Sequence, residues 1–166
     1  MNEHYRKPQI KGFTLVELLV VLVIISAMVS VILPYATRSN DSLRLRQECL
    51  NIAEAVKHAI DLSAQTERPT RILVDPENKC YWLEMADGSS GLNFRPVEGY
   101  LGDTHYLGRN IQIMCGDGCE AGNRAYYLLF DPAVSWPNAF MSVASRNESR
   151  TIKINGKNVE IEESVF

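Results

Sequence analysis

The stretch that decides the fold runs from Lys11 to Pro34 and reads KGFTLVELLVVLVIISAMVSVILP. Between Phe13 and Leu33 it contains 21 residues, and Glu17 is the only charged one among them. At 1.5 Å per residue a helix of this length extends about 31 Å, against roughly 30 Å for the hydrocarbon core of a bilayer. The run therefore predicts a membrane-spanning helix over residues 13–34. Pro34 lacks a backbone donor and is expected to end or kink this helix.

The charges on either side of the run predict its orientation. Residues 1–12 carry a net charge of +2, whereas residues 13–166 carry 14 basic and 19 acidic side chains. Because a short basic flank stays in the cytoplasm, we expect the remainder of the chain to cross the membrane once. A secretory signal peptide is the alternative, but its apolar region is usually only about 7–15 residues long. The acidic remainder argues against nucleic acid as a partner, since phosphate contacts need a positive surface.

A second helical pattern follows the apolar run. Apolar or small side chains recur at steps of three and four, with polar and charged residues between them. This pattern predicts an amphipathic helix over residues 35–66 with one face packed on an apolar surface. That face consists of Leu45, Cys49, Ile52, Val56, Ala59, Ile60 and Ser63.

After Pro69 the pattern changes to strands and turns, which predicts a β-rich head over residues 67–166. The predicted strands are TRILV (70–74), CYWLEM (80–85), IQIMC (111–115), AYYLLF (125–130) and AFMSVA (139–144). The stretch from Gly88 to Gly108 is expected to be a loop. The final TIKINGKNVEIE alternates on both sides of Asn155-Gly156, which predicts a β-hairpin. One long helix followed by strands predicts an α+β fold, with the helix packed on an antiparallel sheet.

Four cysteines follow the apolar run, and an even number in an extracytoplasmic domain favours disulfides. Cys115 and Cys119 in CGDGC can close a small loop, which leaves Cys49 and Cys80 as a second pair. The alternative is four reduced and buried thiols. No metal site is expected, because the spacing of the close pair is not repeated in the other pair.

The histidines give no indication of catalysis. Their positions are His4, His58 and His105, and no motif of a nucleophile, a base and an orienting group surrounds any of them. We therefore expect no enzymatic activity and no cofactor.

The N-terminal stretch resembles the class III signal of type IV pilins and of the pseudopilins of type II secretion. The matching features are a short basic leader ending in Gly12, then Phe13, Thr14, Leu15 and Glu17, about twenty apolar residues, and Pro34. The resemblance implies that a prepilin peptidase cuts between Gly12 and Phe13, removes residues 1–12 and methylates the new amino group of Phe13. It also implies insertion in inner-membrane lipid, a periplasmic head, and assembly with other pilins or pseudopilins of the same fibre.

The same resemblance gives Glu17 a role as the fifth residue of the mature chain. Its carboxylate would contact the N-terminal amine of a neighbouring subunit during assembly. A carboxylate costs about 2.5–3.5 kcal/mol at a bilayer centre, and the N-terminus of a helix returns only about 0.3–1 kcal/mol. A partner of opposite charge is therefore expected. The alternative is that Glu17 lies solvated in the headgroup zone.

The rest of the chain is similar, more loosely, to minor pseudopilins of the GspH/FimT type. The similarity lies in the order of helix and sheet, in YYLLFDP (126–132) and in the closing RTIKINGKNVEI (150–161). Two features depart from that type: no glycine follows the FDP soon, and the basic C-terminal pattern of some DNA-binding minor pilins is absent.

The implied function is that of a minor pseudopilin whose N-terminal helix assembles into a short periplasmic fibre that supports protein export. A minor type IV pilin for pilus priming, adhesion or DNA uptake is the main alternative. A nucleic-acid-binding module and a membrane-tethered enzyme are the others.

Overall fold

The chain contains one long helix that contributes to two compact units. The computed structural model describes residues 13–88, 93–134, 136–146 and 148–164. The units are Met1–Ser39 and Asn40–Phe166, and we call the second unit the head. Helix α1 (Leu15–Thr66) is a single helix of 52 residues that includes most of both predicted helical segments. It continues through Pro34 instead of ending there, and a kink at Pro34 stays a prediction. The expected leader, residues 1–12, lies outside the described residues.

Within the head, α1 presents its predicted face to the core. All seven positions that the sequence placed on this face are buried. Two hydroxyl groups also attach the helix to the strands: Ser63 Oγ donates to the carbonyl of Phe130 (2.8 Å), and Thr70 Oγ1 donates to the carbonyl of Ala59 (2.7 Å). Both hydroxyls are buried, so each bond replaces one that water would otherwise make.

Among the described residues, ten strands form two antiparallel sheets. A six-stranded sheet has the order β3-β2-β1-β7-β6, with β4 also paired to β2, and a four-stranded sheet has the order β10-β9-β8-β5. The strands are β1 (Thr70–Asp75), β2 (Cys80–Ala86), β3 (Phe94–Pro96), β4 (His105–Tyr106), β5 (Gln112–Cys115), β6 (Glu120–Ala121), β7 (Tyr126–Phe130), β8 (Asn138–Ala144), β9 (Ser149–Asn155) and β10 (Asn158–Ser164). The α+β fold class is confirmed, but the single sheet of the prediction is replaced by two.

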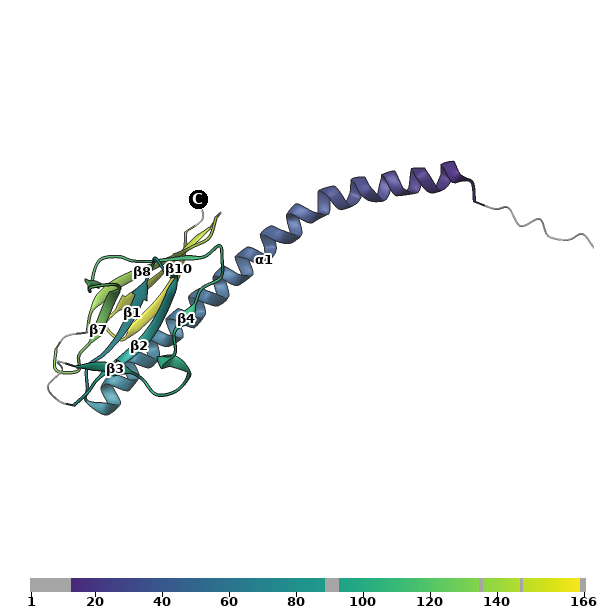
Figure 1. Ribbon diagram of the computed structural model, residues 1–166. Coiled ribbons are helices and arrows are strands. Elements are labelled where there is room, and N and C mark those ends of the chain that lie inside the picture. Colours follow the sequence, from purple (N-terminus) through teal and green to yellow (C-terminus); the bar gives the residue numbers. More distant parts are fainter. Residues whose placement is uncertain (1–12, 89–92, 135, 147, 165–166) are drawn as a thin grey trace, which may run out of the picture. The chain divides into compact units, whose positions relative to one another are not determined.

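Both sheets and the helix share one core. Buried side chains of α1 pack with Ile72 and Val74 of β1, with Leu128 of β7, and with Met141 and Ile152 of the four-stranded sheet. In Figure 1 the C-terminal half of α1 runs behind the strands of the head. The buried stripe of α1 thus shares a single hydrophobic core with both sheets.

The predicted loop between Gly88 and Gly108 contains three short elements. They are β3, the 3-10 helix η1 (Tyr100–Gly102) and β4, and β6 was also missed. Strands of two or three residues are too short to show an alternating pattern, so they cannot be predicted from periodicity. The final hairpin forms as predicted, but Asn155 pairs with Asn158, which places its two-residue turn at Gly156 and Lys157. Gly156 has a φ of 64°, a conformation that favours glycine.

Candidate functional site

The first turn of α1 is capped by Thr14. Phe13 and Thr14 precede the helix, and Thr14 Oγ1 accepts a hydrogen bond from the backbone N–H of Glu17 (3.2 Å). The Thr14 carbonyl accepts from the backbone N–H groups of Glu17 and Leu18 (3.1 and 3.2 Å). Thr14 is therefore the N-cap, and Glu17 stands three residues later, where a capping box places Glu or Gln. Phe13, the residue after the expected cleavage bond, thus lies outside the helix.

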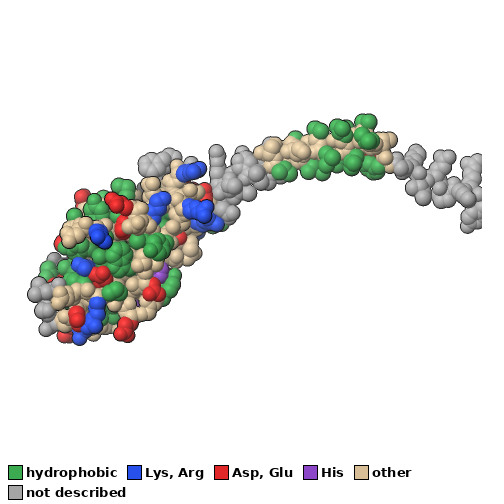
Figure 2. All heavy atoms as spheres, in the orientation of Figure 1, with side chains coloured by type: hydrophobic (Ala, Val, Ile, Leu, Met, Phe, Trp, Pro, Cys, Tyr) green, Lys and Arg blue, Asp and Glu red, His purple; other side chains and the backbone are tan. Residues whose placement is uncertain are grey.

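The helix that follows the cap exposes apolar side chains all around its axis. Every side chain from Phe13 to Ser30 is exposed. Among the large apolar ones the exposed fraction ranges from 41% for Val21 to 79% for Leu15. Figure 2 shows these side chains in green along the visible face. A surface helix of a globular protein hides one apolar face, so this segment needs lipid or other protein chains around it.

The uncharged polar groups of this segment are satisfied by the helix itself. Ser26 Oγ donates to the carbonyl of Leu22 (2.7 Å), and Ser30 Oγ donates to the carbonyl of Ala27 (2.8 Å). Such bonds to the preceding turn remove the cost of placing a hydroxyl in an apolar environment. The two serines are therefore compatible with lipid or with a packed helix bundle.

Glu17 differs from the serines, because its carboxylate forms no hydrogen bond or ion pair with another described residue. Its side chain is exposed among apolar neighbours. The N-cap explains why a carboxylate is tolerated in the first turn, but the interaction with the helix N-terminus is worth only about 0.3–1 kcal/mol. The carboxylate is thus a negative group on an apolar segment with no partner in the described part of its own chain.

The structure forms one of the two expected disulfides. Cys115 and Cys119 are bonded and close the CGDGC loop, with Cα atoms 6.0 Å apart. Gly118 in this loop has a φ of 88°, and a side chain there would collide with the backbone of Asn138. The loop therefore needs glycine at this position.

The second expected pair, Cys49 with Cys80, does not form. Both thiols are buried and free. Cys49 belongs to the shared core with Tyr81 and Leu83 of β2. Since successive side chains of a strand point to opposite faces, Cys80 lies on the other face of β2 from Tyr81 and Leu83. The six-stranded sheet therefore separates the two sulfur atoms.

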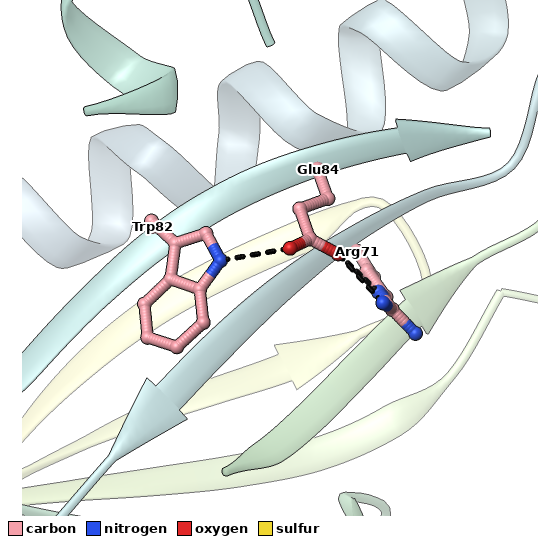
Figure 3. Close-up of polar contacts among 3 residues, drawn as sticks. All are labelled: Arg71, Trp82 and Glu84. Carbon is pink, nitrogen blue, oxygen red and sulfur yellow. Dashed lines mark hydrogen bonds and ion pairs between the residues drawn. The ribbon is translucent and has the colours of Figure 1, made fainter. Parts of the chain in front are cut away.

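A polar network that the sequence pattern does not predict lies on this outer face of the six-stranded sheet. Glu84 Oε1 accepts from Trp82 Nε1 (3.0 Å), and Glu84 Oε2 accepts from Arg71 Nε (2.8 Å) and Nη2 (2.6 Å), as Figure 3 shows. The Arg71 guanidinium lies 4.1 Å from the ring centroid of Phe94 and 5.4 Å from that of Tyr127. Arg71 and Glu84 are directly paired across β1 and β2, so the strand register, once known, brings them together.

A second cluster joins the segment between β3 and β5 to α1. The ring of His105 stacks on Tyr81 and meets the edge of Tyr100, and its Nε2 lies 2.7 Å from the Tyr100 carbonyl oxygen. Glu48 is half-buried beside this segment, and burial raises the pKa of its carboxyl group against the opposing effect of hydrogen bonds from Gly108 and Asn51. No group of three or more potential metal ligands occurs among the described residues.

Across the described residues, no helix is both long and apolar enough to qualify as a membrane span.

Comparison with known proteins addresses the N-terminal segment directly. Residues 7–33 match the prokaryotic N-terminal methylation motif. The match includes the expected cleavage bond, the Thr14 cap and Glu17, and it indicates a type IV pilin or a pseudopilin. Such a motif implies processing by a prepilin peptidase and assembly with other pilins. No curated protein and no solved structure matched the chain.

Proposed function

We propose that this chain is a minor pseudopilin of a type II secretion system, an assembly subunit with no catalytic role. The observation that carries the proposal is the segment from Phe13 to Ser30. It exposes apolar side chains on all sides, contains Glu17 as its one charge, and lies within the match to the methylation motif. The precursor is anchored in the inner membrane by residues 13–34, with residues 1–12 in the cytoplasm and the head in the periplasm.

The apolar segment serves in two environments. Before assembly its Leu, Val and Ile side chains contact lipid, and after assembly they contact the equivalent helices of neighbouring subunits. A helix that is apolar all around can make this exchange without rotating a polar face into lipid. The helix 35–66 and the strands of residues 67–166 then form the periplasmic part, which contributes lateral or tip contacts to the fibre.

Glu17 provides the specific contact in this scheme. Its carboxylate pairs with the α-amino group of Phe13 on a neighbouring subunit, which has the opposite charge and lies near the same depth. The missing partner within the described chain supports this pairing. A second copy of the Thr14 cap presents its own Phe13 just outside the helix, where another subunit can reach it.

Analysis of the mature N-terminus tests the general class. The full chain is expressed together with a prepilin peptidase, and the intact protein is measured by mass spectrometry. We expect a chain that begins at Phe13 with one methyl group on its amine, and an uncut chain for the Gly12→Val variant. A mature chain that begins at any other residue would refute the prepilin interpretation.

Substitution of Glu17 tests the assembly contact. Glu17→Gln should leave insertion in the membrane intact and reduce the fraction of subunits in fibres at least tenfold. The reason is the loss of a charge-assisted bond worth about 1.5–3 kcal/mol, which corresponds to roughly 10–100-fold. Glu54→Gln is the matched control, because Glu54 is an exposed carboxylate of the same helix within the head. If the Glu17→Gln protein assembles normally, the proposed pairing of Glu17 with a neighbouring subunit is refuted, and Glu17 is only a solvated carboxylate in the headgroup zone.

The match to the motif applies equally to a minor type IV pilin, and the similarity to the GspH/FimT type favours the pseudopilin. Deletion of the gene separates the two functions. Loss of protein export with normal surface pili supports the pseudopilin, whereas loss of pili, adhesion or DNA uptake with normal export supports the pilin.

A further inference from the structure

The four-stranded sheet ends in a strand with a free edge. Among the described residues, β5 pairs with β8 on one side and with no strand on the other. Gly116, just after β5, donates its backbone N–H to the carbonyl of Phe140 in β8 (2.9 Å). Because bonded and non-bonded residues alternate along an antiparallel ladder, Met114 also bonds toward β8, whereas Ile113 and Cys115 turn their N–H and C=O groups to the free edge. Two residues of β5 therefore present backbone donors and acceptors to which a further strand can pair.

The other edge strands of the two sheets are blocked in ways that β5 is not. β3 contains Arg95 and Pro96, β4 and β6 are only two residues long, and β10 carries three glutamates. Charges, prolines and short length are common means of keeping a sheet edge from pairing with another chain. β5 has four residues, none of them charged or proline, and its Met114 is 62% exposed. β5 is therefore the edge that remains open to a further strand.

A hollow of about 670 Å³ lies beside this edge. Met114 and Cys115 line it from β5, and residues 75–78 and 121–126 of the other sheet form the rest of its wall. A strand occupies about 4.8 Å along the hydrogen bonds and about 10 Å across the sheet, so this volume accommodates about 14 Å of strand, or roughly four residues. The hollow thus has room for one added strand as long as β5, and not for the edge of a second sheet.

The edge is fixed in place before any strand binds. The disulfide between Cys115 and Cys119 closes the loop that follows β5, and Gly116 in this loop packs against the ring of Phe140. Ile113 is buried in the core of the head. A rigid edge loses little entropy when a strand pairs with it.

The side chains of β5 define the kind of segment that the edge accepts. Gln112 and Met114 are exposed, whereas Ile113 is buried and Cys115 is half-buried, so the last two face inward. Side chains directly opposite each other on two paired strands share a face. A residue paired with Ile113 or Cys115 therefore also faces inward, into the hollow, where Tyr126 offers an apolar surface. Such a segment needs apolar side chains at alternate positions.

The charged groups of the wall do not select a charged ligand. The two carboxylate oxygens of Asp75 accept hydrogen bonds from the backbone N–H and the side-chain amide of Asn78 (2.9 and 2.7 Å). Glu77 and Arg124 add one charge of each sign. The wall has no excess of charge beyond a carboxylate that is already hydrogen-bonded, so pairing through the backbone is the recognition that it favours.

We propose that the free edge of β5 binds an extended segment of a partner protein, which adds one strand to the four-stranded sheet. The paired part of this segment is uncharged and has apolar side chains at alternate positions. Its backbone supplies the affinity, and its inward side chains supply the specificity. The inference goes beyond the proposed function and does not depend on it, because it concerns contacts within the head alone.

Residue-resolved hydrogen–deuterium exchange of the full chain in detergent tests the proposal. The probe is a synthetic peptide with the sequence of β8, NAFMSVA, flanked by lysines for solubility, because this sequence already pairs with β5 in the fold. In the free chain the amides of Ile113 and Cys115 should exchange faster than the amide of Met114. At a peptide concentration about ten times its Kd, these two amides should exchange about tenfold more slowly, since only the unbound tenth of the molecules exchanges.

Two lysine variants at equally exposed positions separate this edge from the rest of the head. Met114→Lys places a charge on the edge and removes the burial of one methionine, so it should weaken peptide binding at least tenfold. Val134→Lys is the matched control, because Val134 is 63% exposed and does not line the hollow. This control should keep the wild-type Kd.

N-methylated peptides test whether the backbone carries the contact. Methyl groups on the amides of the first Ala, the Met and the Val of the peptide remove the donors that face β5, and should abolish binding. Methyl groups on the intervening Phe and Ser amides face away from β5 and should be tolerated.

The remaining outcomes overturn the proposal. It is refuted if the peptide does not slow exchange at Ile113 and Cys115, if Met114→Lys binds as tightly as Val134→Lys, or if both methylated peptides bind equally. Protection of the two amides that rises with protein concentration in the absence of peptide would assign the edge to a second copy of the chain, and also overturns the partner segment. The mature N-terminus is measured separately, so failure of the edge site leaves the proposed function intact.

Discussion

Replacement of Glu84 by Gln should destabilise the head much more than an equivalent change at the surface. Both carboxylate oxygens of Glu84 are in use, one by Trp82 and the other by Arg71. An amide offers only one acceptor oxygen, so one donor loses its partner and the ion pair loses its charge. A neutral hydrogen bond contributes about 1 kcal/mol and a charged one about 1.5–3 kcal/mol. Because the Arg71 and Glu84 side chains are 25% and 14% exposed, some of this is screened, and we expect a loss of about 2 kcal/mol.

The matched control is Glu162→Gln on β10. Glu162 forms one bond with Lys153 (2.8 Å), and their side chains are 53% and 45% exposed, so the loss should stay below about 0.5 kcal/mol. The assay is chemical denaturation of the full chain in detergent, followed by the near-ultraviolet signal of the aromatic side chains. Trp82→Phe, which removes the indole donor together with part of the ring, should cost about 1.5 kcal/mol. If Glu84→Gln costs no more than Glu162→Gln, the network does not stabilise the sheet and this reasoning fails.

Two further predictions concern the thiols and the pH dependence of stability. Burial raises the pKa of the Cys49 thiol to about 11 and also raises the pKa of Cys80, so neither thiol should react with a maleimide in the native chain. Both should react in denaturant. Cys115 and Cys119 should react only after their disulfide is reduced. Rapid native labelling, or a peptide linking Cys49 to Cys80 in a digest, would contradict this structure. Burial also raises the pKa of the Glu48 carboxyl group above 4.5. At a pH just above 4.5, Glu48 therefore keeps a proton in the folded chain that it has lost in the unfolded chain. The free energy of unfolding should fall as the pH rises through this window. Urea denaturation across this range should show a flatter profile for Glu48→Gln, and identical profiles would remove Glu48 as the cause.

Local patterns in the sequence determined much of the fold. The seven positions predicted for the inner face of the second helical segment are the ones that α1 buries, because a period of 3.6 residues is a property of the helix alone. The five strands predicted between Thr70 and Ala144 form within one residue of their expected bounds, since four to six alternating or apolar residues bounded by turns define a strand locally. The helix from Leu15 to Thr66 runs through Pro34, because neighbouring turns maintain a helix that a single missing donor weakens.

The N-terminal candidate site was also accessible from the sequence. Gly12, Phe13 and Glu17 stand in a fixed local register, which the match over residues 7–33 recognises without any tertiary contact. The Thr14 cap adds the structural reason that the helix begins where it does. A motif of this kind can be recognised from the sequence alone, because it consists of particular residue types at fixed spacing along the chain.

Only the tertiary structure decided which distant residues meet. The packing of α1 against one face of the six-stranded sheet leaves Cys80 on the outer face of β2, away from Cys49, and the pairing of β1 with β2 sets Arg71 directly opposite Glu84. The fold also leaves Met114, on the free edge of β5, in the wall of a hollow that turns of the other sheet complete. The sequence by itself determines the helix, the strands and the processing motif, because these depend on neighbours along the chain. Strand pairing, the faces of buried thiols and the free edge of β5 depend on hydrogen bonds between segments that are remote in sequence, and only the folded chain fixes those.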